Sequence, residues 1–387
     1  MQNIKITKLI PGGQALGTTP DGKKVFFWNA LPGEIVKEYQ ITKNKSHYAE
    51  AIATNILHSS PHRIFPQDKC YLSTSPWQIM DYDYELSQKS ALVQEIFREH
   101  SIIMEQPQII TDNNPYYYRN KMEYSLYWNH DLNTIQLSFH QRGSHRKIPI
   151  TSSSLEHPEI FTTAQQIVDD LNARHEEARK YQSILLRCNQ SGEVSGGLYE
   201  NGKPHPVFPN LTDDILGQKY SYSPNGFFQI NLPVYELALQ EICQHITTSK
   251  VLDLYAGVGT IGLSVARDKE LTLVEVDKFA FHELCSNITK APHNIHAILS
   301  KSEEALNYIQ PNITVILDPP RAGCDAKLIN KLLEVTPPKI IYLSCNPATQ
   351  ARDIKVLLEK YQIDTIKTFN FFPRTPHIEN LVILSQK

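Results

Sequence analysis

The sequence predicts an α/β protein in three parts: a small N-terminal β-barrel, a central α+β domain and a C-terminal doubly wound sheet. Three observations predict this fold class. Short apolar–polar alternations between glycine turns fill the first part, strand and helix patterns mix in the second, and strands alternate with helices from residue 249 onward. The 387 residues also exceed what one hydrophobic core usually serves. We place the domains at residues 1–57, 58–222 and 223–387.

The first part, residues 1–57, is expected to form five short strands. Turn signals such as Gly12-Gly13 and Asp21-Gly22 divide it at spacings typical of a small closed barrel of the OB type. Residues 1–60 contain seven lysines and four acidic residues, a local charge of +3. The lysines are Lys5, Lys8, Lys23, Lys24, Lys37, Lys43 and Lys45. Charge alone favours an ordinary solvated surface, and a nucleic-acid-binding face is the alternative.

The middle part is expected to mix helices with strands. Residues 59–63 form a linker, residues 83–105 a helix centred on "ALVQEIF", and residues 116–150 several strands. A helix-rich piece is expected over 155–180, and strands continue from there to about residue 222.

In the third part, strand patterns and helix patterns follow each other with short connections. The expected strands are "KVLDLY", "LTLVEVD", "ITVILDPP", "KIIYLSCNP" and the final "HIENLVILSQ". The expected helices are "TIGLSVARD", "AFHELCSNIT", "AKLINKLLEV" and "ATQARDIKVLLEKY". This alternation indicates a doubly wound parallel sheet, in which ligands bind beyond the carboxyl ends of the strands.

Composition places the chain among globular proteins of a reducing compartment. Hydrophobic residues make up 41% of the chain, charged residues 20%, and the formal net charge is −3. No apolar run approaches the ~20 residues of a membrane helix, and Lys5 and Lys8 interrupt any signal-peptide core. The six cysteines lack CxxC spacing, which argues against a disulfide framework and a zinc site. We expect a cytoplasmic protein.

The stretch "DLYAGVGTIG" is the first candidate ligand-binding motif. Its glycines, Gly257-x-Gly259-x-x-Gly262, follow a buried strand and open a helix, which permits close approach of the backbone to a ligand. Glu275 ends the next strand, where its carboxylate can accept hydrogen bonds from a ribose diol. Nicotinamide cofactors and S-adenosylmethionine both fit this pattern, and Asp253 on the first strand favours S-adenosylmethionine. A glycine turn without a ligand is the third interpretation.

Two further strands end in residues that can carry chemistry. Asp318 precedes a double proline that cannot continue its strand, and Cys345 ends "KIIYLSC". The carboxyl ends of parallel strands share one edge of a sheet, so we expect Glu275, Asp318 and Cys345 together there. A lone cysteine is usually a small core residue, but this position makes Cys345 a candidate nucleophile. A simple strand-ending turn at Asp318 is the alternative.

The segment "FFPRTPHIENLV" supplies a candidate base. Glu379 lies between Ile378 and the apolar "LVIL" strand, where poor solvation raises the pKa of a carboxyl group and makes it a better base near neutral pH. His377 is the competing base. A polar turn in which neither residue acts is the remaining alternative.

Together these residues resemble the S-adenosylmethionine-dependent RNA uracil-5-methyltransferase family, whose members act on tRNA or 23S rRNA. The motifs "SPNGFFQIN", "DLYAGVGT", "LVEVD", "DPPR", "SCNP" and "HIEN" stand in the family's order. Residues 1–57, with "GGQALG" and "ALPGE", are similar to the TRAM domain, an RNA-binding barrel. "YRNKMEY" resembles the strand of the central domain that faces RNA. The resemblance implies a Rossmann-like methyltransferase domain over residues 223–387.

The resemblance also implies roles for single residues. The positions that hold S-adenosylmethionine correspond to Gln229, Tyr255, Glu275 and Asp318, the nucleophile to Cys345 and the proton acceptor to Glu379.

The chain departs from the family in one place. Many relatives carry a four-cysteine iron–sulfur site before a Trp-Gln pair. Here Ser73, Thr74 and Ser75 stand where cysteines would be, and Cys70 is alone. One thiolate cannot hold a cubane cluster, which takes about four ligands. We expect neither a cluster nor another metal site.

The chemistry of uracil explains why a thiol and a base are both needed. Carbon 5 is too poor a nucleophile to take a methyl group until a thiolate adds at carbon 6, and a base must then remove the proton from carbon 5. The target base must also be flipped out or unpaired. We expect methylation of uridine in RNA, with 23S rRNA favoured over tRNA because of the barrel, by a monomer that binds neither DNA nor membranes.

Three other functions stay open. A nicotinamide-dependent oxidoreductase rests on the glycine turn alone. An adenine-N6 methyltransferase needs an aromatic residue after the double proline, where Arg321 stands. An RNA-binding protein with an inactive methyltransferase domain is the non-enzymatic alternative, against which the intact Cys345 and Glu379 argue.

Overall fold

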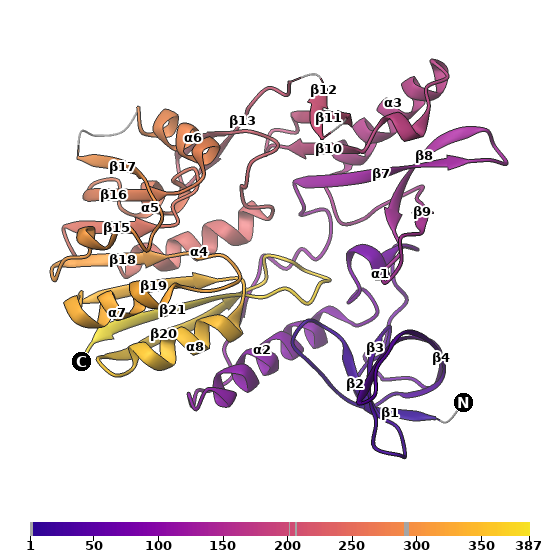
Figure 1. The fold of residues 1–387 in the computed structure, drawn as a ribbon, viewed down its shortest axis with the longest axis horizontal. Coiled ribbons are helices and arrows are strands. Elements are labelled where there is room, and N and C mark those ends of the chain that lie inside the picture. Colours follow the sequence, from indigo (N-terminus) through magenta and orange to yellow (C-terminus); the bar gives the residue numbers. More distant parts are fainter. Residues whose placement is uncertain (1–2, 201, 206, 290–293) are drawn as a thin grey trace.

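The computed structural model describes residues 3–200, 202–205, 207–289 and 294–387. Its chain forms a small barrel, a six-stranded sheet and an eight-stranded sheet, which occupy the lower right, upper right and left of Figure 1. Within the described residues, no helix is both long enough and apolar enough to cross a bilayer.

The N-terminal strands close into the expected five-stranded barrel, in the order β1-β2-β3-β5-β4. They are β1 (Ile4–Leu9), β2 (Ala15–Thr18), β3 (Lys24–Trp28), β4 (Ile35–Asn44) and β5 (Tyr48–His58). Alternate residues such as Ile4, Ile6 and Phe27 fill the interior. Gly17 lies where a Cβ atom would stand 2.5 Å from Cγ2 of Ile4, so this wall of the barrel requires a glycine.

Two helices lead from the barrel into the middle of the chain: α1 (Tyr71–Thr74) and α2 (Tyr82–Glu99). The carboxylate of Asp81 caps α2 by accepting the amide hydrogen of Tyr84 at 2.7 Å. The expected end of this helix at residue 105 is wrong. The helix ends at Glu99 because Ser101 adopts a left-handed conformation (φ 65°) that a helix cannot continue.

The middle part centres on an antiparallel sheet in the order β12-β11-β10-β7-β8-β9. Its strands are β7 (Lys121–Asn129), β8 (Thr134–His140), β9 (Lys147–Pro149), β10 (Ser183–Cys188), β11 (Val194–Glu200) and β12 (Lys203–His205). Helix α3 (Pro158–Ala173) packs on this sheet through residues such as Ile160 and Val168. The expected helical piece to residue 180 stops short, because His175 is left-handed (φ 53°) and only a 3-10 turn, Ala178–Lys180, follows. A hairpin of β13 (Leu211–Ile215) and β14 (Gln218–Tyr222) leads onward.

The eight-stranded sheet has the order β17-β16-β15-β18-β19-β21-β20-β6. The strands are β6 (Ile109–Ile110), β15 (Lys250–Leu254), β16 (Glu270–Glu275), β17 (Ile295–Leu299), β18 (Ile313–Leu317), β19 (Lys339–Ser344), β20 (Tyr361–Phe369) and β21 (Glu379–Gln386). Strand β21 pairs antiparallel with both β19 and β20, so the sheet is not wholly parallel as expected. A hairpin joins β20 to β21, and this connection reverses the chain direction.

Helices cover both faces of this sheet, as a doubly wound fold requires. They are α4 (Leu232–Gln244), α5 (Thr260–Val265), α6 (Lys278–Ile288), a 3-10 turn at Leu306–Tyr308, α7 (Ala326–Val335) and α8 (Pro347–Leu357). Successive residues of β19 alternate between two cores: Ile340 packs in the core with α7 and α8, and Ile341 packs in the core with α4 and α5. The predicted fold class is confirmed.

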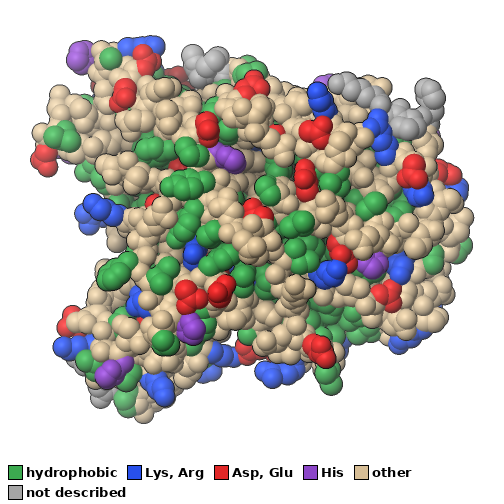
Figure 2. All heavy atoms as spheres, turned by 180° about the vertical axis from the view of Figure 1, so that it is seen from behind, with side chains coloured by type: hydrophobic (Ala, Val, Ile, Leu, Met, Phe, Trp, Pro, Cys, Tyr) green, Lys and Arg blue, Asp and Glu red, His purple; other side chains and the backbone are tan. Residues whose placement is uncertain are grey.

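The barrel packs against the rest of the protein. One continuous apolar cluster runs from its interior through Trp77 and helix α2 to the α7–α8 face of the large sheet. The indole of Trp77 is buried and donates to the carbonyl of Gly13 at 3.0 Å. Figure 2 shows the molecule from behind, where its outline is hollowed between the barrel and the six-stranded sheet.

Candidate active site

The predicted catalytic residues meet at one edge of the large sheet. Asp318 follows β18 and Cys345 follows β19, so both lie where these parallel strands end. Glu379 begins β21, and because β21 runs antiparallel, its beginning lies at the same edge. Ser344 pairs with Asn380, so the next position places Cys345 opposite Glu379. The structure therefore brings a thiol and two carboxyl groups together.

The thiol of Cys345 is half-buried between these carboxyl groups. Burial raises its pKa to about 11, and the charges of Glu379 and Asp318 act in the same direction, whereas Arg321 lowers the pKa. At neutral pH the resting group is therefore a thiol. Attack as a thiolate requires that its proton moves to an acceptor.

The two carboxyl groups hold protons more tightly than usual. Burial raises the pKa of Asp318 to about 7. Burial also raises the pKa of Glu379 well above the normal value of a glutamate, and the charge of Asp318 adds to this effect. A carboxylate with a raised pKa is a stronger base once it is ionised.

The competing base has the opposite character. His377 lies just before β21, and burial together with the nearby guanidinium of Arg321 lowers its pKa to about 4. A neutral imidazole with so low a pKa is a weak proton acceptor. These pKa directions favour Glu379 over His377 as the base.

Arg321 is the functional candidate that sequence reasoning missed. Its guanidinium lies 3.3 Å from Nδ1 of His377 and lowers the pKa of Cys345. Its carbonyl accepts hydrogen bonds from Nδ2 of Asn346 (2.8 Å) and Oγ1 of Thr349 (3.2 Å), which tie the double-proline loop to the turn after Cys345. The signal was present in "DPPR", but only the contact across two loops shows that the arginine faces the thiol.

The glycine turn and Glu275 form the neighbouring part of the same edge. The carboxylate of Glu275 accepts the amide hydrogens of Gly257 (2.7 Å), Val276 (2.8 Å) and Asp277 (2.6 Å). A carboxylate offers about four lone-pair sites, so these bonds orient the group and leave room for a ligand hydroxyl. Gly257 is left-handed (φ 57°), and nothing lies within 4 Å of where its Cβ would stand.

Residues around this turn fit an adenosine-containing cofactor. Val276 and Phe279 present exposed apolar surface beside Glu275. Asp253 is buried beneath the turn, where Oδ2 accepts the amide hydrogen of Gly262 at 2.9 Å and Oδ1 has no partner. Burial raises the pKa of Asp253 to about 8. An open space beside the turn and exposed apolar side chains suit a ligand with an aromatic base.

The other two predicted cofactor residues lie differently. Gln229 is buried just before α4, and Nδ2 of Asn120 donates to its carbonyl at 2.9 Å. Tyr235, in the first turn of α4, has a raised pKa. Burial is the main cause, and the charge of Asp318 acts in the same direction. Tyr255 lines a surface cavity of about 640 Å³ together with Pro320 and Cys324. The cofactor roles of all four residues, Gln229, Tyr255, Glu275 and Asp318, stay predictions.

Comparison with known proteins identifies the family. Residues 214–387 match the family model of tRNA (uracil-5-)-methyltransferases, and residues 1–54 match that of the TRAM domain. The C-terminal part of the chain, residues 214–387, belongs to the RNA uracil-5-methyltransferase family. Two relatives named as uncharacterized RNA methyltransferases align over almost their whole length. The protein of Enterococcus faecalis is 28% identical (95% of this chain, 93% of the relative), and that of Thermosynechococcus vestitus is 26% identical (99% and 97%).

A solved structure shares the fold over the whole chain. The crystal structure of the Pyrococcus abyssi tRNA (uracil-54, C5)-methyltransferase in complex with S-adenosyl-L-homocysteine superimposes with a TM-score of 0.79. It covers 99% of this chain and 99% of its own, at 22% identity. The chain is an RNA methyltransferase with a TRAM barrel, and neither the oxidoreductase nor the inactive RNA-binding protein is favoured.

The place of the family's iron–sulfur site holds a polar network in this methyltransferase. The amide of Gln78 donates to Asp68 (2.8 Å) and to Ser75 (2.7 Å), and the hydroxyl of Ser154 donates to Asp68 (2.7 Å). Cys70 is buried nearby, and burial raises the pKa of its thiol to about 12. In the described part of the chain, no three metal-ligating side chains gather. That the purified protein contains no cluster stays a prediction.

Proposed function

We propose that this methyltransferase transfers a methyl group from S-adenosylmethionine to carbon 5 of a uridine in RNA, through a covalent bond between Sγ of Cys345 and carbon 6 of the uracil. The observation that carries the proposal is the register of β19 and β21, which sets Cys345 opposite Glu379 at the edge of the sheet. A nucleophile and a base at adjacent positions are the minimum set for this reaction.

Each residue has a defined step. The thiol of Cys345 loses its proton to the carboxylate of Asp318, which leaves Glu379 ionised for the last step, and the thiolate adds to carbon 6 to give an enolate with electron density at carbon 5. S-adenosylmethionine would supply an electrophilic methyl group, which carbon 5 would take as the bond from that methyl group to sulfur breaks and S-adenosylhomocysteine leaves. Glu379 then takes the proton from carbon 5, the double bond between carbons 5 and 6 re-forms, and the thiolate leaves. The guanidinium of Arg321 supports the thiolate electrostatically.

The RNA itself is open to a direct test. The barrel favours 23S rRNA, whereas the matched family model and the Pyrococcus abyssi enzyme are named for tRNA. We propose 23S rRNA as the first substrate and tRNA as the alternative. A monomeric state and a cytoplasmic location also stay proposals.

Two measurements on the purified protein test this function. Labelled S-adenosylmethionine with tRNA and 23S rRNA in separate reactions should yield label in 5-methyluridine, and the RNA that takes label is the substrate class. RNA with 5-fluorouridine at the target should trap a covalent complex, because fluorine cannot leave as a cation. Cys345→Ala should form no complex. A complex that persists in Cys345→Ala, or label in another nucleoside, would overturn the proposal.

A further inference from the structure

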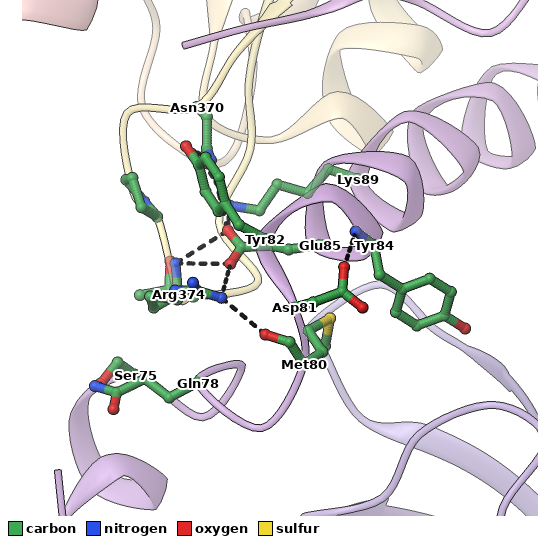
Figure 3. Close-up of polar contacts among 12 residues, drawn as sticks. Ser75, Gln78, Met80, Asp81, Tyr82, Tyr84, Glu85, Lys89, Asn370 and Arg374 are labelled. Carbon is green, nitrogen blue, oxygen red and sulfur yellow. Dashed lines mark hydrogen bonds and ion pairs between the residues drawn. The ribbon is translucent and has the colours of Figure 1, made fainter. Parts of the chain in front are cut away.

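The loop before the proposed base is held by buried charges from a distant part of the chain. Residues 370–378 connect β20 to β21, carry His377 and lead directly into Glu379. Helix α2 packs against this loop with two ionisable side chains, Glu85 and Lys89, which are fully buried. Figure 3 shows both side chains directed at the loop from the helix.

Glu85 binds the middle of the loop through hydrogen bonds. Its two carboxylate oxygens accept the backbone amide hydrogen of Arg374 at 3.0 and 3.1 Å, and Oε2 lies 3.5 Å from Nη1 of the same arginine (Figure 3). Nη1 also donates to the carbonyl of Met80 at 2.8 Å. Arg374 itself is buried and left-handed (φ 62°), a conformation that costs free energy in a non-glycine residue and persists only when its surroundings impose it.

Lys89 holds the start of the loop. Its ammonium group donates to Oδ1 of Asn370 at 2.6 Å and to the carbonyl of Phe372 at 3.0 Å, and lies 3.1 Å from Glu85. The far end of the loop is held separately, because the side chain of Asn380 donates to Gln350 at 2.7 Å. The loop is therefore fixed at its start, at its middle and just beyond Glu379.

Stability alone does not account for such an arrangement. Burying one carboxylate and two cations has a desolvation cost, and apolar side chains of similar volume often stabilise a protein equally well or better. Buried charged groups whose hydrogen bonds all go to defined partners instead fix the geometry of the backbone that they contact. Here that backbone leads, within five residues of Arg374, to the carboxyl group that must reach carbon 5.

We propose that Glu85 and Lys89 are positioning residues for the methyl-transfer reaction. They hold the 370–378 loop so that the carboxylate of Glu379 lies beside Cys345, where it can take the proton from carbon 5 of the uracil. This inference rests on the proposed function of Glu379. The residues act through the loop and do not touch the RNA or the cofactor. Their loss should therefore slow the last step, proton removal, more than the first, attack of the thiol.

The test separates these steps in Glu85→Gln. The release of the covalent, methylated RNA complex should slow by about 10- to 100-fold, because misplacing a catalytic group by about 1 Å can cost that much. The rate of complex formation with 5-fluorouridine RNA and the affinity for S-adenosylmethionine should stay within about threefold of the original protein, because neither uses the loop, a change of less than 1 kcal/mol. Glu99→Gln, an exposed position on the same helix, is the matched control and should change nothing.

A second variant distinguishes positioning from folding. Glu85→Gln leaves two buried cations, so the double variant Glu85→Gln/Lys89→Met, which removes one charge of each sign, should regain stability but keep the slow release. Equal losses in complex formation, cofactor affinity and release, or a release rate equal to that of the original protein, would overturn the positioning role.

Hydrogen exchange of residues 370–378 gives a readout independent of the reaction. Exchange at the amide of Arg374 should accelerate in Glu85→Gln. If the original protein forms no complex with 5-fluorouridine RNA, the proposed function fails on its own. In that case unchanged exchange in Glu85→Gln would show that Glu85 does not hold the loop either, and faster exchange would leave it as a loop anchor without a role in this reaction, which overturns the positioning proposal.

Discussion

At the scale of single residues, the site combines a thiol that holds its proton with carboxyl groups that hold theirs. Burial dominates the raised pKa of both Cys345 and Glu379. The same burial that disfavours the charged resting forms makes each group more reactive once it is ionised, because water no longer solvates it.

Glu379→Gln should stall the reaction after methyl transfer. An amide cannot take the proton from carbon 5, whereas attack by Cys345 and methyl transfer precede that step. The variant should accumulate a denaturation-stable complex with ordinary RNA, visible as a shifted band on a denaturing gel. His377→Gln is the comparison, and accumulation in that variant instead would assign the base to His377.

Removing the charge of Arg321 should slow attack by the thiol in a pH-dependent way. The charge of Arg321 lowers the pKa of Cys345, so Arg321→Gln should raise a pKa that is already about 11. Below its pKa, the thiolate fraction falls about tenfold per pH unit. Complex formation with 5-fluorouridine RNA should therefore rise with pH between 7 and 9 in both proteins and be slower in Arg321→Gln at each pH. Arg321→Lys keeps the charge and should recover part of the rate, and a rate in Arg321→Gln equal to that of the original protein would show that the charge does not act on the thiol.

The residues that end strands could be predicted from sequence, and those that act through contacts could not. Asp318 and Cys345 follow apolar runs, and the geometry of parallel strands places such positions at one edge. Glu85 and Arg374 lie 289 residues apart, and no local pattern pairs them. The same holds for Arg321 and His377, which meet only because two loops close over the sheet.

At the scale of elements, prediction succeeded where both faces of a strand are buried. Strands β15, β18 and β19 read as apolar runs because helices cover them on both sides. The sequence reading missed β17 and β20. Strand β17 lies at an edge with mostly accessible residues, and β20 mixes Gln362, Asp364 and Lys367 into its run, so neither shows a continuous apolar pattern.

Two glycines of the proposed cofactor turn should respond differently to alanine. A Cβ at Gly259 would stand 2.5 Å from Cδ1 of Leu284, and Gly259 is also left-handed (φ 91°), so Gly259→Ala should lower the free energy of unfolding by about 2–5 kcal/mol through overpacking and backbone strain. A Cβ at Gly257 meets nothing, so Gly257→Ala adds only the cost of its left-handed conformation, roughly 1–2 kcal/mol, but intrudes on the ligand space. Gly257→Ala should weaken S-adenosylmethionine binding more than Gly259→Ala does.

Each variant is the control for the other. Denaturant unfolding without ligand measures stability, and calorimetric titration measures affinity for S-adenosylmethionine. If Gly257→Ala binds the cofactor as tightly as the original protein, the open space before the turn is not the cofactor site.

At the scale of the whole molecule, the barrel and the catalytic sheet form one body. Their shared apolar cluster passes through Trp77 and α2, and Lys8 of the barrel forms an ion pair with Glu95 of α2. Removing residues 1–57 would therefore expose Trp77 and its neighbours, and any loss of RNA binding would have two causes. Charge changes on the intact protein isolate the contribution of the barrel.

Four of the seven barrel lysines gather at one end, around the tip of the β4–β5 hairpin. Lys24 of β3 lies opposite Tyr48 of the neighbouring strand β5, and the ammonium group of Lys43 lies 5.5 Å from the centre of the Tyr48 ring. The ammonium group of Lys23 donates to the side chain of Asn44 at 2.6 Å. Lys45 follows in the exposed turn. In Figure 2 the lower left lobe, which is the barrel, carries Lys and Arg side chains at several places on its rim. A stacking aromatic ring among cations suits single-stranded RNA.

The variant Lys23→Gln/Lys24→Gln/Lys45→Gln should weaken RNA binding and flatten its dependence on salt. Each lost phosphate contact should reduce the slope of log affinity against log salt by about 0.7 on single strands, since fewer counterions are released. Affinity for S-adenosylmethionine should not change, because its proposed site lies at the edge of the large sheet. Lys5→Gln/Lys37→Gln, at exposed positions away from the hairpin tip, is the comparison. Equal slopes in all three proteins would show that the lysines at the tip are only a solvated surface.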